Sequence, residues 1–154
     1  MLAHQFQCTK LQIKLTMSEF NPKERTLARE NILKILYQHD LNGYSFSEIT
    51  NTFVEKRNYD REYFINIIQL YESNIECIND FIEQNSDISL IKLPSIDRSI
   101  LRLAVCELQY RDDIPQKVVL NESINIAKKY SSTESYKFIN KILDQLLVKI
   151  KKND

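Results

Sequence analysis

Apolar residues recur at helical spacing along most of this 154-residue chain. Asp60 stands as a capping residue before one clear stripe, which contains Phe64, Ile67, Ile68, Tyr71, Ile75, Ile78 and Ile82. This pattern predicts a long helix from Asp60 to about Gln84. Between residues 96 and 110, apolar side chains surround most of the helix circumference, which is typical of a central, buried helix.

Capping residues mark the start of the elements before that helix. Asn21-Pro22 is expected to begin a helix that runs to about Leu41. Ser45-Phe46-Ser47-Glu48 has the pattern of a capping box and predicts a second, short helix. Residues 86–94 are predicted to form a connector, and Ser95 is expected to cap the central helix.

Two further helices are predicted after the central one. Pro115 restarts the chain as a helix to about Tyr130. The last helix has an inner stripe made of Phe138, Ile142, Leu146 and Ile150. Together the pattern predicts an all-α protein with one domain at residues 19–150. Residues 1–18 are expected to form a flexible extension, and residues 151–154 a polar tail.

The composition narrows the range of functions. The single glycine, Gly43, excludes a phosphate-binding loop and a dinucleotide fingerprint, because both need two or three glycines. The chain has 21 basic and 21 acidic residues, so its net charge is zero. Any affinity for nucleic acid therefore has to come from a local basic patch.

No motif for catalysis or metal binding is evident in the sequence. The histidines, His4 and His39, belong to no cluster with the ligand spacing of a zinc site. The cysteines are scattered and form no C-x-x-C pair. We therefore expect a protein without enzymatic activity, metal or cofactor. The absence of an 18-residue apolar run and of a secretory signal favours the cytoplasm.

Basic residues gather in and around the first predicted helix, at Lys23, Arg25, Arg29 and Lys34. Arg25 and Arg29 are four residues apart and therefore share one face of the helix. Arginine suits phosphate binding and base stacking. The residues alone nevertheless favour a solvated helix face, whose charge Glu24 and Glu30 neutralise.

Polar residues within the apolar helices form a separate group. These residues are expected to make internal hydrogen bonds and helix caps and not to bind a ligand. The group consists of Arg98, Arg102, Glu107, Asn121 and Glu122.

Residues 96–145 carry the most informative pattern of the chain. Its parts, in chain order, are Ile96-Asp97-Arg98-Ser99-Ile100-Leu101-Arg102, Glu107-Leu108, Ile114-Pro115 with Lys117-Val118, Asn121-Glu122-Ser123, Ala127-Lys128, Ser135 with Lys137-Phe138-Ile139-Asn140, and Leu143-Asp144. A weaker pattern runs from Ala28-Arg29-Glu30 to Leu36-Tyr37-Gln38. In this order, the parts resemble the NusB family of bacterial transcription antitermination factors.

The resemblance implies a fold and a function. The fold would be a NusB-like bundle of about seven helices, packed around helix 96–110. The function would be the binding of boxA RNA in ribosomal RNA transcripts, together with NusE, which is also a small-subunit ribosomal protein. Other Nus factors and RNA polymerase would be further partners, and the protein would be a monomer or a homodimer.

The resemblance also implies roles for single residues. Arg25 and Arg29 match family arginines that bind RNA, and Phe138 matches an aromatic residue near the RNA. Lys23 and Lys137 are expected to add phosphate contacts. The residues that match family positions at the NusE interface are Tyr37 and Asp97.

The chain departs from the family pattern at three positions. Thr26 and Leu27 stand where the family often has basic residues, and Lys141 stands where it usually has glycine. Two alternative functions remain open. One is a helical homodimeric scaffold. The other is a stand-alone RNA-binding domain related to that of ribosomal RNA cytosine methyltransferases.

Overall fold

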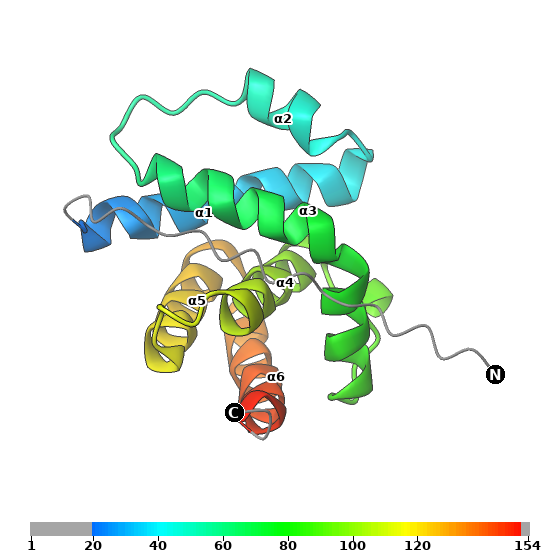
Figure 1. Ribbon diagram of the computed structural model, residues 1–154. Coiled ribbons are helices and arrows are strands. Elements are labelled where there is room, and N and C mark those ends of the chain that lie inside the picture. The colour runs from blue at the N-terminus through cyan, green and yellow to red at the C-terminus, as the bar shows by residue number, and fades with distance from the viewer. Residues whose placement is uncertain (1–19, 152–154) are drawn as a thin grey trace.

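The computed structural model describes residues 20–151 as a bundle of helices (Figure 1). The elements are α1 (Pro22–Asn42), α2 (Phe46–Thr52), α3 (Arg61–Gln84), the 3₁₀-helix η1 (Leu90–Lys92), α4 (Ser95–Tyr110), α5 (Gln116–Tyr130) and α6 (Thr133–Lys151). Residues 20–151 contain no strand. The all-α prediction is thus confirmed, and so is the expected number of about seven helices when η1 is counted.

Some predicted segments cannot be compared with the structure. The predicted extension at residues 1–18 and residues 152–154 of the predicted tail lie outside the described residues. Within residues 20–151, no helix is both long enough and apolar enough to span a bilayer.

Helix α1 begins and ends at the residues that the sequence indicates. The side chain of Asn21 accepts hydrogen bonds from the backbone N–H groups of Lys23 and Glu24, and Pro22 occupies the first turn. Gly43 ends the helix in the left-handed conformation, with φ of 69°, and its N–H donates to the carbonyl oxygen of His39. This geometry satisfies backbone groups that the helix itself leaves unpaired at each end.

Helix α3 is bent, which the continuous apolar stripe did not predict. Asp60 caps its start as expected and accepts from the N–H of Tyr63. Asn74 has non-helical backbone angles in the middle of the helix, and its buried Nδ2 donates to the carbonyl oxygen of Leu70 at 2.8 Å. This side chain inserts into the helix ladder, which accounts for the bend. The second half of α3 turns away from α1 (Figure 1).

Helix α4 lies at the centre of the bundle and confirms the prediction for residues 96–110. It contacts α1, α3, α5 and α6, and its fully buried residues are Ser99, Leu101, Ala104, Val105 and Cys106. One detail differs. Ser95 does not cap the helix, since Pro94 occupies the cap position and the Ser95 hydroxyl donates to Asp40.

Replacing Gly43 tests the end of α1. A Cβ at this position would meet no atom within 4 Å, so the penalty is conformational and not steric. We expect Gly43→Ala to lower the free energy of unfolding by about 1 kcal/mol. Gly43→Asn should lower it less, because asparagine tolerates the left-handed conformation. Urea denaturation followed by circular dichroism measures both, and equal effects of the two variants would contradict this explanation.

Candidate nucleic-acid interface

The start of α1 carries an exposed lysine and an arginine that is held by other groups. Lys23 is exposed. The Nε of Arg25 donates to Asp60 at 2.8 Å, and its side chain is only 13% exposed. Its guanidinium group lies 4.7 Å from the ring centroid of Phe20 and 4.6 Å from that of Tyr63. Arg25 therefore reaches the surface only at its edge.

Arg29 lies inside the protein, and not on an exposed surface shared with Arg25. It donates two hydrogen bonds to Glu107, at 2.8 and 2.9 Å, and lies 3.8 Å from Glu122. Burial alone would lower the pKa of Arg29, but the hydrogen bond to Glu107 and the nearby charges outweigh it, so the pKa is raised. The charge of Arg29 is thus neutralised within the fold.

A second group of cations surrounds the turn between α5 and α6. Lys128 and Lys137 are exposed, and the Nζ of Lys128 lies 5.3 Å from the ring centroid of Tyr136. The Nζ of Lys129 donates to Glu30 at 2.8 Å, which fastens the end of α5 to the middle of α1. Phe138 is half-buried and packs against the core.

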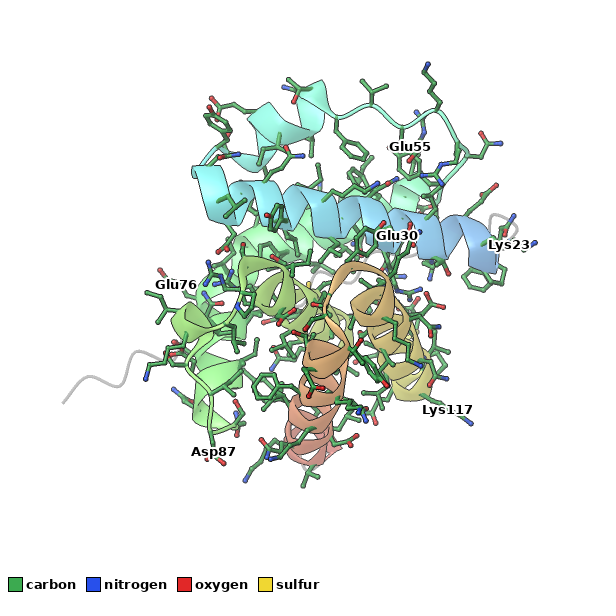
Figure 2. The ribbon with its side chains drawn as sticks, turned by 180° about the vertical axis from the view of Figure 1, so that it is seen from behind. Lys23, Glu30, Glu55, Glu76, Asp87 and Lys117 are labelled. Carbon is green, nitrogen blue, oxygen red and sulfur yellow. The ribbon has the colours of Figure 1, made fainter. Side chains whose placement is uncertain are left out.

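The structure brings α1 and the α5–α6 turn together, although the predicted RNA-binding residues differ in how far they are buried. Glu30, where the turn meets α1, lies about two helical turns after Lys23. Figure 2 shows Lys23 in the first turn of α1 and Glu30 further along the helix. We call the surface formed by Lys23, Lys128, Lys129 and Lys137, with the edge of Arg25, the basic face.

The two predicted partner residues differ in exposure. Tyr37 is 37% exposed on α1 and lies about two turns beyond Glu30, so both share one side of the helix. Asp97 is buried in the first turn of α4 and accepts a hydrogen bond from the hydroxyl of Ser131. Asp97 therefore attaches the α5–α6 turn to α4.

The polar residues expected to serve the fold mostly do so. Arg98 donates to Asp40 at 2.7 Å, and Arg102 donates to the other oxygen of Asp40 at 2.9 Å. Glu122 accepts from the Thr26 hydroxyl at 3.0 Å. Asn121, by contrast, is exposed on α5.

Asp40 is a structural residue that the sequence pattern did not indicate. It lies in the last turn of α1, where the helix dipole disfavours a carboxylate. An acid in this unfavourable position could have indicated a cationic partner elsewhere in the chain. Within residues 20–151, no three His, Cys, Asp or Glu side chains are grouped so that they could hold a metal ion.

Breaking the buried pair should destabilise the fold strongly. Arg29→Met leaves the Glu107 carboxylate buried without its partner, which costs about 3–5 kcal/mol of unfolding free energy. The double variant R29M/E107M removes both charges and should be clearly more stable than R29M. Urea denaturation compares the two proteins. A double variant as unstable as the single one would show that the charge pair is not the cause.

The stability of the fold should depend on pH through Asp40. Burial raises the pKa of this carboxyl, but hydrogen bonds from Ser95, Arg102 and Arg98 outweigh it and the pKa is lowered. Because the folded pKa is below the unfolded one, about 3.9, the stabilisation is complete above that value and is lost as the pH falls through the folded pKa. The difference in unfolding free energy between wild type and Asp40→Asn should shrink when urea denaturation is repeated at decreasing pH. A constant difference from pH 6 to below pH 3 would contradict this role.

The amino-acid sequence is similar to a known family over most of its length. The profile of the NusB family matches residues 26–147. The transcription antitermination protein NusB of Clostridium novyi is 37% identical over 129 residues, which are 80% of this chain and 97% of that protein. The NusB protein of Alcanivorax borkumensis is 33% identical over 128 residues, covering 81% of this chain and 85% of that protein.

Solved structures agree with this similarity. NusB of T. maritima superposes with a TM-score of 0.72 and 34% identity, over 79% of this chain and 89% of that one. A chain from the crystal structure of antitermination factors NusB and NusE in complex with dsRNA gives a TM-score of 0.71 and 25% identity, over 82% and 97% of the two chains. Sequence and fold together show that the chain belongs to the NusB family.

Proposed function

We propose that this protein is a transcription antitermination factor, which binds boxA RNA of ribosomal RNA transcripts together with NusE and catalyses no reaction. The observation that carries this proposal is the match to a NusB relative whose structure contains both NusE and RNA, over 97% of that relative's chain. Other Nus factors and RNA polymerase would then be partners of the assembled complex, and the site of action would be the cytoplasm.

The basic face is the surface that supports RNA binding. Lys23, Lys128 and Lys137 are exposed, so their ammonium groups can approach phosphates. Tyr136 contacts Lys128, and Phe138 follows Lys137 in the sequence. Both rings are half-buried and could present their edges or faces to unpaired bases. Arg25 can add its exposed edge, at the cost of weakening its contact with Asp60.

Arg29 supports this face from inside. Its ion pair with Glu107 joins α1 to α4, and the Thr26–Glu122 hydrogen bond joins α1 to α5. Both contacts fix the first turns of α1, which carry Lys23 and Arg25. We therefore assign Arg29 to the positioning of the RNA face, and direct contact with RNA to the exposed cations.

Tyr37 and Asp97 support a protein-binding surface next to the basic face. Tyr37 offers an exposed aromatic ring with a polar tip, which is common at the energetic centre of protein interfaces. Asp97 would act indirectly, since it holds the α5–α6 turn that lies near Tyr37 along α1. NusE is the partner that this proposal places over Tyr37.

Fluorescence anisotropy with a boxA RNA from the same genome tests the proposal. A scrambled RNA of equal length is the control, and both are titrated with and without NusE at two salt concentrations. A preference for boxA that NusE strengthens is the expected result. Equal binding of both RNAs, even with NusE present, would overturn the assignment.

Single lysine substitutions test the basic face. We expect Lys23→Ala and Lys137→Ala each to weaken RNA binding and to reduce the slope of log affinity against log salt by about one. Lys149→Ala is the matched control, because Lys149 is also exposed but lies near the end of α6. The same anisotropy titrations measure all three variants. A wild-type slope in both Lys23→Ala and Lys137→Ala would remove this surface from the proposal.

A further inference from the structure

The charges of this neutral protein are separated between two parts of the chain. Residues 61–94, which contain α3 and η1, have two basic residues and six acidic ones, namely Glu62, Glu72, Glu76, Asp80, Glu83 and Asp87. Residues 116–150, in α5 and α6, have three acidic residues and six lysines, namely Lys117, Lys128, Lys129, Lys137, Lys141 and Lys149. A net charge of zero therefore conceals an acidic part and a basic part.

The six acidic residues of the first part form an exposed surface, which we call the acidic stripe. Each of the six is exposed. Glu76, Asp80 and Glu83 follow one another at spacings of three or four, which places them along one side of the second half of α3, and Glu72 precedes the bend at Asn74. Among residues 20–151, no lysine or arginine forms an ion pair with any of the six. Their negative charge is consequently open to solvent.

From Glu72 to Asp87, the acidic stripe lies on a different side of the molecule from the basic face, whereas Glu62 is two residues from Asp60, which pairs with Arg25. Helix α3 packs on α1 and α4, whereas α5 packs on α4 and α6. Figure 2 shows Glu76 and Asp87 on one side of the bundle, with Lys23 and Lys117 on the opposite side. The charge separation along the chain is thus also a separation in space.

Screening limits how far each of these charges acts. The Debye length is about 10 Å at 0.1 M salt, and a domain of this length has a radius of gyration of about 15 Å. An RNA strand bound to the basic face therefore senses the acidic stripe on the opposite side only weakly. A strand that approaches α3 meets its carboxylates directly and is repelled.

We propose that the acidic stripe is a specificity device that excludes RNA from the α3 side and so confines RNA to the basic face. This inference rests on the proposed function, because it assumes that the basic face binds RNA. The stripe suppresses nonspecific RNA contacts, which would otherwise occur anywhere on the surface. It leaves the specific contact unchanged, since that contact lies beyond its screened reach.

The triple variant E72Q/E76Q/D80N tests the inference, with E72D/E76D/D80E as a control that keeps the charge. The substituted residues are exposed, and circular dichroism verifies that each variant is folded. At 0.1 M salt, the affinity of the neutralised variant for scrambled RNA should rise about fivefold, whereas its affinity for boxA RNA should stay within about twofold of wild type. The control variant should match wild type with both RNAs.

Two further readouts separate this inference from the proposed function. Heparin, a polyanion without sequence, should elute the neutralised variant at higher salt than wild type, whether or not boxA is preferred. Ultraviolet crosslinking to scrambled RNA should label peptides of α3 in the neutralised variant only. Unchanged heparin elution together with unlabelled α3 would overturn the role proposed for the acidic stripe. An equal rise in affinity for both RNAs would overturn it as well. If the wild-type protein shows no preference for boxA RNA over scrambled RNA, the proposed function is overturned instead.

Discussion

The buried contact between Arg29 and Glu107 is the constraint on which the rest of the structure depends. Two charges removed from water are tolerated only when each satisfies the other with good geometry, and here two hydrogen bonds of 2.8 and 2.9 Å do so. The contact joins α1 to α4, which are 78 residues apart at these positions. A shift of either helix along the other would leave a charge unpaired, so the contact fixes their register.

Tyr63 extends this constraint to α3. Its ring is fully buried, and the guanidinium groups of Arg25, Arg29 and Arg111 lie 4.6, 5.2 and 5.5 Å from its centroid. The negative faces of an aromatic ring attract such cations. Tyr63 of α3 therefore lies among three arginines. Two of them belong to α1, and the third, Arg111, directly follows α4. The first turns of α1, which carry the exposed Lys23, are held by this group from within.

The sequence predicted the helices well because their apolar periodicity and capping residues are local signals. The central position of α4, the Asp60 cap and the end of α1 at Gly43 all follow from such signals. The bend at Asn74 could not be predicted, since it depends on one buried side chain that bonds within its own helix. The burial of Arg29 was missed for a related reason. Helical spacing shows which residues share a face, but only the contact with Glu107 decides that this face is internal.

The proposed function gives the two kinds of basic residue separate tasks. Six of the seven arginines form ion pairs with carboxylates inside residues 20–151, and they are Arg25, Arg29, Arg57, Arg98, Arg102 and Arg111. The planar, multidentate guanidinium suits such fixed contacts with carboxylates, which join different elements at Arg29, Arg98 and Arg102. The exposed part of the basic face is left mainly to lysines, whose point charge attracts phosphate with little geometric preference. A surface of this kind supplies affinity that depends on salt but little base discrimination. Sequence preference then has to come from the aromatic residues beside the lysines or from a partner protein, which is the arrangement expected of a factor that grips RNA together with NusE.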